Sequence, residues 1–169
     1  MRAMTEHNLK DAFAGESQAH MKYLAFADKA AQDGFPQVAL LFKAISYAEQ
    51  VHAVNHLKEL AGVGDTAANL QGALGGENFE VDEMYPAYMA VAQLQQEKGA
   101  QRSIRFAIEA EKIHADMYRA ALEAVQAGKD IDVTKVSICP VCGHTVFGDA
   151  HERCPVCNVP ADKYVAFTA

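Results

Sequence analysis

The sequence predicts a mainly α-helical protein: a four-helix bundle followed by a small metal-binding module that is rich in β-type residues. Apolar residues recur at helical spacing through most of the chain, whereas every cysteine lies in its C-terminal part. A chain of 169 residues that is 50% hydrophobic is long enough for one sizeable core and one appended module. The composition changes near residue 128. We therefore expect a bundle over 1–128, a linker over 129–136 and the cysteine module over 137–169.

The first two helices are predicted over 5–33 and 36–61. Thr5 is a candidate N-cap for the first, and the Gly34 region followed by Pro36 is a stop signal and then a restart. The second helix is expected to end at the glycines that follow residue 61. At about 1.5 Å of rise per residue, helices of this length have the size found in bundles.

The second half of the bundle is predicted as a long loop and two further helices. Residues 62–76 are rich in glycine, which favours a loop that crosses between two helical hairpins. The third helix is expected over 77–98 and the fourth over 100–126. Pro86 should kink or loosen the third helix, because proline lacks the N–H group that the helix needs.

The four cysteines form two C-x-x-C pairs that are separated by eleven residues: Cys139, Cys142, Cys154 and Cys157. Four soft ligands at this spacing predict one tetrahedral sulfur site, which selects zinc or iron. The module is too small to fold well by burying apolar surface alone. The bound metal should therefore contribute much of its stability.

A second metal site is predicted from glutamate and histidine. Glu49 precedes His52, and Glu111 precedes His114, by three residues each. This spacing places both side chains of a pair on one helix face. The remaining helices offer single carboxylates, namely Glu16 in the first and Glu77 and Glu80 in the third. One such pair is common on exposed helix faces, but two in alternate helices, with glutamates in the others, match the ligand pattern of di-iron carboxylate bundles.

Composition excludes several classes of function. The formal net charge is −7 and the chain has no run of basic residues, which argues against binding to nucleic acid or to an acidic membrane surface. No apolar segment has the length of a membrane span or the character of an export signal. Cysteines that are confined to metal-type pairs agree with a reducing compartment, so a cytoplasmic location is expected.

Taken together, these residues resemble the rubrerythrin family, in which a ferritin-like di-iron bundle precedes a rubredoxin-like iron site. The resemblance extends over nearly the whole chain. Its specific segments are Gly15-Glu16-Ser17-Gln18-Ala19, Glu49-x-x-His52, Gly76-Glu77-Asn78-Phe79-Glu80, Glu83-Met84-Tyr85-Pro86, Ala110-Glu111-Lys112-x-His114 and both Cys-Pro-Val-Cys pairs. Asn158 departs from the pattern, because a glycine often stands there, but asparagine tolerates positive φ and should keep the turn.

The resemblance implies a site of two iron ions and a separate iron ion held by the four cysteines, which recombinant protein could exchange for zinc. Glu49 and Glu111 would bridge the two irons, with Glu16, Glu77, Glu80 and His114 as terminal ligands. It also implies an exchange at one iron, where Glu80 binds in the oxidised state and His52 in the reduced state. These seven residues would be both the metal ligands and the catalytic set.

The resemblance further implies a peroxidase that reduces hydrogen peroxide to water and serves in oxidative-stress defence. The rubredoxin-like centre would return the electrons, which come from NAD(P)H through a separate reductase or rubredoxin, since this chain has no nucleotide-binding motif. Family members often form homodimers, either head-to-tail or with exchanged helices. Two alternatives stay open: a ferroxidase that sequesters iron, and an interaction protein in which zinc fills the cysteine site for structural reasons.

Overall fold

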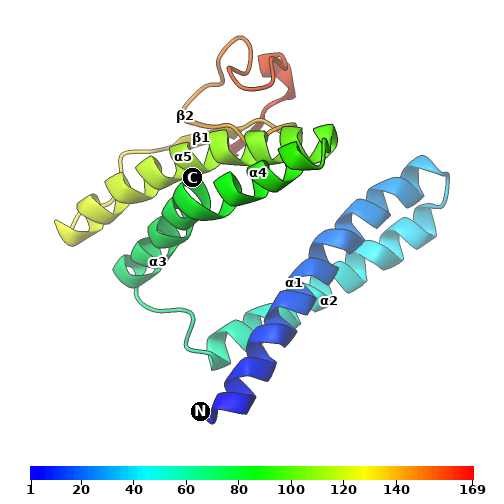
Figure 1. Ribbon diagram of the computed structural model, residues 1–169, viewed down its shortest axis with the longest axis horizontal. Helices are drawn as coiled ribbons and strands as arrows, with labels where there is room; N and C mark the ends of the chain where they lie inside the picture. The colour runs from blue at the N-terminus through cyan, green and yellow to red at the C-terminus, as the bar shows by residue number, and fades with distance from the viewer. The chain divides into compact units, whose positions relative to one another are not determined.

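A computed structural model describes all residues, 1–169, as a largely helical chain with one small sheet. The predicted fold class, a helical bundle protein with a small β-containing cysteine module, is confirmed. The chain divides into two compact units, Met1–Gly64 and Asp65–Ala169, and each is described here by itself. All helices of the first unit are drawn in blue to cyan in Figure 1.

The first unit is a hairpin of two long helices, α1 (Ala3–Gln32) and α2 (Pro36–Glu59). Small residues occupy the contact between the helices. Those that are buried are Ala27, Ala30, Ala39, Ser46 and Ala53. Short side chains let the two helix backbones approach closely, and the Ser46 hydroxyl donates a hydrogen bond of 2.9 Å to the His20 carbonyl across the contact. The hairpin thereby sets the positions of the glutamates that both helices carry.

The ends of these helices follow the prediction in part. Gly34 has φ +84° after the last turn of α1, so the predicted stop is confirmed. The N-cap prediction is wrong, because α1 begins at Ala3 and Arg2 is the cap residue, without a side-chain hydrogen bond. Ala3 and Met4 are good helix formers, and nothing upstream of Thr5 breaks the helix. At the far end α2 stops at Glu59, two residues before the predicted end.

The second unit begins with α3 (Thr66–Phe79), so the predicted loop over 62–76 is wrong for most of its length. Asp65 starts this helix as an N-cap, where its carboxylate accepts a hydrogen bond of 2.8 Å from the Ala68 N–H. Leu74 is buried against Ala115 and Leu122 of α5 (Lys98–Gln126), which is the helix that was predicted over 100–126. This apolar packing outweighs the low helix propensity of the glycines in α3.

A five-residue π-helix, η1 (Glu80–Met84), separates α3 from α4 (Tyr85–Leu94). The Tyr85 N–H bonds to the Glu80 carbonyl, five residues back, and Pro86 follows directly. Pro86 cannot donate a backbone hydrogen bond, and a wider turn accommodates its ring. The prediction that this helix loosens near Pro86 is therefore confirmed.

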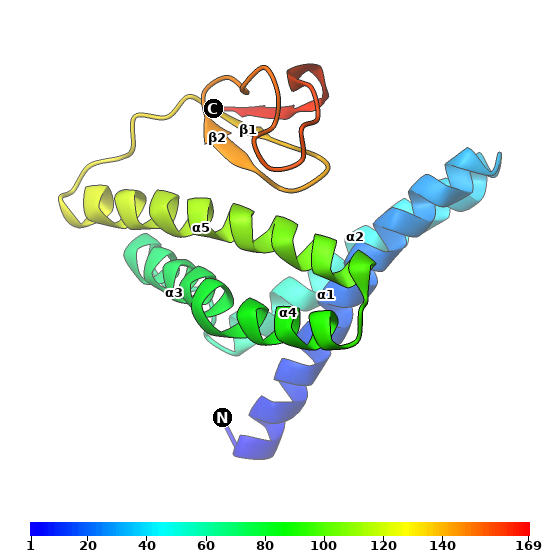
Figure 2. The same ribbon diagram turned by 45° about the horizontal axis from the view of Figure 1, so that its top comes forward.

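The C-terminal part of the second unit is a three-stranded antiparallel sheet in the order β2-β1-β3. Its strands are β1 (Lys135–Ile138), β2 (Thr145–Phe147) and β3 (Val165–Thr168), with a 3-10 turn, η2 (Ala161–Lys163), before the last. β2 lies alongside α5 (Figure 2), and β1 pairs with β2. The core of this module consists of three cysteines, and Phe106 of α5 packs against them.

None of the helices combines the length and the apolar character that a membrane span requires.

Candidate metal sites

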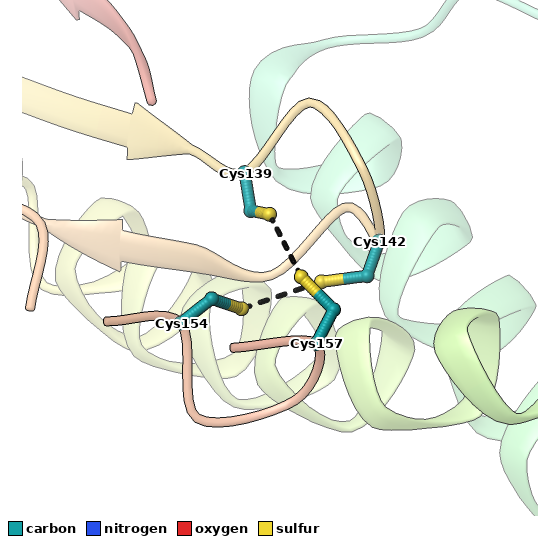
Figure 3. Close-up of side chains that lie close together, drawn as sticks. All are labelled: Cys139, Cys142, Cys154 and Cys157. Atoms are coloured by element: carbon teal, nitrogen blue, oxygen red, sulfur yellow. Dashed lines mark hydrogen bonds between the residues drawn. The ribbon is translucent and has the colours of Figure 1, made fainter. Parts of the chain in front are cut away.

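The four cysteines lie together at the tips of two loops (Figure 3). Sγ of Cys139 lies 3.5 Å from Sγ of Cys157, and Sγ of Cys142 lies 3.5 Å from Sγ of Cys154. All four sulfur atoms lie within 4.8 Å of one another, and three of the cysteines are buried. Four thiol sulfurs that surround one point fit a tetrahedral metal ion.

Two matching turns place these sulfurs. The Gly143 N–H bonds to the Cys139 carbonyl at 3.0 Å, and the Asn158 N–H bonds to the Cys154 carbonyl at 2.9 Å. The residue that closes each turn has positive φ, +80° at Gly143 and +65° at Asn158. Asparagine thus adopts the left-handed conformation at the second turn, as predicted.

Hydrogen bonds favour the ionised form of one thiol. Burial raises the pKa of Cys142. Burial also opposes ionisation of Cys154, but hydrogen bonds from the Tyr164 hydroxyl and from backbone N–H groups outweigh it and lower the pKa of that thiol to about 6. Since metal ligands must be thiolates, the module already stabilises one of the four charges that a cation would bind.

The first unit brings Glu16 of α1 together with Glu49 and His52 of α2. Nδ1 of His52 lies 2.9 Å from a Glu49 carboxylate oxygen and 3.8 Å from one of Glu16. The His52 side chain is 53% exposed, and no protein group bonds to its Nε2. The cluster therefore offers three candidate ligands, two carboxylates and a half-exposed imidazole.

The second unit holds a cluster of the same composition, formed by Glu77 of α3 with Glu111 and His114 of α5. Nδ1 of His114 lies 2.6 Å from a carboxylate oxygen of Glu111 and 3.8 Å from a carboxylate oxygen of Glu77. This imidazole is 28% exposed, and its Nε2 forms a hydrogen bond of 2.7 Å with the Thr145 hydroxyl of β2. No local sequence pattern pointed to Thr145, because the contact joins residues that are 31 positions apart in the chain.

Burial and charge repulsion both disfavour ionisation in this second cluster. Burial, and then the negative charge of Glu111, raise the pKa of Glu77 to about 7. The same two causes raise the pKa of Glu80. The pKa of Tyr85 is raised by burial and then by the charges of Glu80, Glu111 and Glu77. Glu80 is therefore within electrostatic reach of the cluster, although only Glu77, Glu111 and His114 converge closely enough to form it.

The burial of Glu77 and its repulsion by Glu111 predict a pH-dependent stability of protein whose carboxylate clusters hold no metal. The pKa of Glu77 is raised from the ordinary 4.5 to about 7, so the folded state binds its proton more tightly than the unfolded state. Stability should therefore fall as the pH rises from about 4.5 to about 7. In Glu77→Gln the fall should be smaller, and the variant should be the more stable protein above pH 7. Urea unfolding that is followed by circular dichroism measures both effects.

The matched control is Glu123→Gln on the exposed face of α5, which should keep the wild-type pH dependence. A Glu77→Gln variant whose stability depends on pH as steeply as that of wild type would show that Glu77 is not the source of the pH dependence.

Comparisons with known proteins agree with this geometry. The sequence pattern of the Rubrerythrin family matches residues 7–122, which contain both carboxylate clusters. The chain belongs to the rubrerythrin family. It is 44% identical to Rubrerythrin-2 of Clostridium acetobutylicum, over 98% of this chain and 97% of that protein. It is 36% identical to Nigerythrin of Nitratidesulfovibrio vulgaris, over 96% and 86% of the two chains.

A solved nigerythrin structure, described as fully reduced and all ferrous, aligns with a TM-score of 0.58 at 34% identity and covers 96% of this chain and 86% of the other. The family binds iron at a carboxylate and histidine site and at a four-cysteine site. Both donor sets are present here, the hard oxygen and nitrogen ligands in two clusters and the soft sulfur ligands in one. Membership of the rubrerythrin family also indicates that the protein is an oxidoreductase with a role in oxidative stress.

Proposed function

We propose that this protein is a peroxidase that reduces hydrogen peroxide to water with electrons delivered through its four-cysteine iron centre. The observation that carries the proposal is the combination of a one-electron sulfur site with two carboxylate and histidine clusters in one chain. Storage of ferric iron does not require a dedicated electron donor, which is why we prefer a peroxidase to a ferroxidase. A di-iron centre would supply two electrons, one from each ferrous ion, to cleave the O–O bond with uptake of two protons.

The proposed ligands are the residues that the family pattern marks. Glu49 and Glu111 are the bridging carboxylates, and Glu16, Glu77, Glu80 and His114 are terminal ligands. The short contacts of Glu49 with His52 and of Glu111 with His114 support this set. His52 would replace Glu80 as a ligand on reduction, as the family pattern implies, and its half-exposed side chain is compatible with such an exchange.

The electron source is proposed to be NAD(P)H, used by a separate reductase or rubredoxin that docks on the cysteine module. Val141, which lies in the first cysteine turn, is 54% exposed and gives an apolar contact beside the sulfur site. We also propose a homodimer, head-to-tail or with exchanged helices, and a reducing compartment such as the cytoplasm, because four thiols must stay reduced to bind iron.

The test is anaerobic stopped-flow spectroscopy of the iron-loaded, fully reduced protein mixed with hydrogen peroxide. We expect the visible thiolate-to-ferric bands of the cysteine site to reappear rapidly, and much more slowly when dioxygen replaces peroxide. This outcome requires both reaction at the carboxylate site and electron transfer from the cysteine site.

Two other outcomes would contradict the proposal. Bands that form with oxygen and peroxide at similar slow rates would favour iron storage. A protein that shows no bands although its carboxylate site is loaded with iron would have zinc in the cysteine site and no internal electron donor.

A further inference from the structure

The hydrogen bond between Thr145 and His114 can be assigned a direction. The Thr145 hydroxyl lies 2.9 Å from the Gly143 carbonyl oxygen and 2.7 Å from Nε2 of His114. A hydroxyl has one proton to donate, and a carbonyl oxygen can only accept. Both contacts are satisfied together only if Thr145 donates to Gly143 and accepts from an N–H at Nε2 of His114.

This direction determines which ring nitrogen can bind a metal ion. A neutral imidazole that carries its proton on Nε2 has its free lone pair on Nδ1. Nδ1 is the atom that lies 2.6 Å from Glu111 and 3.8 Å from Glu77. A lone pair on Nδ1 and a carboxylate oxygen at 2.6 Å repel each other unless a proton or a cation lies between them. The tautomer that Thr145 selects is thus the one that suits a cation in this cluster.

Thr145 is held firmly in this position. It is 6% exposed and begins β2, where it pairs with Ile138 of β1. The turn that contains Gly143 packs on α5, since a Cβ atom added to Gly143 would lie 3.5 Å from the Ala110 side chain. Ala110 precedes His114 by one helical turn and lies on the same helix face. Within this unit, the packing of the Gly143 turn on α5 therefore holds the cysteine module at a set distance from the His114 ring.

The surroundings of the His114 ring are mostly apolar. A cavity of about 400 Å³ borders the His114 ring, and apart from His114, Tyr118 and Thr145 its lining is apolar. Without the hydroxyl, Nε2 would lose its hydrogen bond of 2.7 Å and face this mostly apolar cavity. His52 of the first unit shows the contrast, because its Nε2 has no protein partner and its ring is about half exposed.

We propose that Thr145 is a positioning residue of the metal site: from the cysteine module it fixes the tautomer and orientation of His114 so that Nδ1 binds the metal ion. This inference rests on the proposed assignment of His114 as a ligand. Partners that orient ligand histidines in this way are typically worth about 10-fold to 100-fold in metal affinity. The hydroxyl, not the rest of the side chain, carries this effect.

The test uses full-length protein. Its cysteine site is first filled with zinc so that the module stays folded. The carboxylate site is then titrated with Co²⁺ in competition with a chromophoric chelator. Thr145→Val should weaken Co²⁺ binding about 10-fold or more, whereas Thr145→Ser should bind like wild type. Thr168→Val, an exposed position at the end of β3, is the matched control and should have no effect.

A second measurement reads the hydrogen bond directly. In the Co²⁺-loaded protein, NMR should detect a hyperfine-shifted ring N–H of His114 that exchanges slowly with water in wild type and Thr145→Ser, and quickly in Thr145→Val. Unchanged affinity and unchanged exchange in Thr145→Val would overturn the inference.

The His114→Ala variant separates this inference from the proposed function. If His114→Ala binds Co²⁺ like wild type, His114 is not a ligand and the proposed site itself fails. If His114→Ala loses affinity while Thr145→Val keeps it, the site stands and only the positioning role of Thr145 is rejected.

Discussion

Replacing Glu111 with alanine will abolish peroxide turnover and leave a reducible four-cysteine iron centre. A carboxylate oxygen of Glu111 lies 2.6 Å from Nδ1 of His114. Besides burial, the charge of Glu111 raises the pKa of both Glu77 and Glu80, so Glu111 is the central anion of the second cluster. Without it, one histidine and one close glutamate remain there, and the charge that balances the metal ions is reduced. Peroxide consumption with a chemical reductant, measured beside metal content and the visible spectrum, tests this result.

Matched controls come from the same helices. Glu109→Ala, two residues away on α5, removes only a surface ion pair of 2.8 Å with Lys112 and should keep full activity. The first unit offers the equivalent pair, Glu49→Ala against the exposed Glu59→Ala. Full activity in either Glu49→Ala or Glu111→Ala would reject the proposed ligand set.

The second large effect is expected when iron is removed from the cysteine site: the module over 135–169 will unfold while the helices remain. Cys139, Cys142 and Cys154 are themselves the buried core of this module, and its strands have only three or four residues each. Structural metal ions bound by such cysteine sites contribute about 10 kcal/mol or more of apparent binding free energy, which a core of this size cannot replace.

Limited proteolysis with mass spectrometry would measure this effect. Cleavage should appear within 135–169 after iron is removed by acid and a chelator, with little change in the helical circular dichroism signal, and zinc should restore the protection. The matched variant is Cys142→Ser, which should show the same cleavage without any chelator. A module that resists protease in the metal-free state would show that its apolar contacts are sufficient.

Much of the candidate site could be predicted from the sequence because its spacings are local. A glutamate and a histidine three residues apart share a helix face whatever surrounds them, and this holds for Glu49 with His52 and for Glu111 with His114. The cysteine pairs are equally local, because each turn closes through one backbone hydrogen bond. The contact of Thr145 with His114 could not be predicted from the sequence, because it depends on how the cysteine module packs on α5.

The largest error in the predicted fold is the loop over 62–76, and it has one physical origin. Gly72, Gly75 and Gly76 made the segment before Glu77 look like a loop, yet it forms most of α3. Intrinsic propensity disfavours a helix there, while the Asp65 cap and the burial of Leu74 on α5 favour it. The packing partner of Leu74 lies about forty residues later in the chain, so local patterns could not weigh the two effects.

The π-helix before Pro86 also bears on how this sequence should be compared with others. Each residue of an α-helix turns the chain by about 100°, so a π-turn acts as a one-residue insertion that the helix absorbs without breaking. Deleting one residue from Glu80–Met84 would allow regular α-helical bonding and leave Tyr85 on nearly the same helix face relative to Glu77. The same deletion in a regular stretch of helix would rotate every later side chain by about 100°. An alignment gap placed in this segment is therefore one that the helix can absorb, whereas a gap elsewhere in the helix would change which side chains face α5.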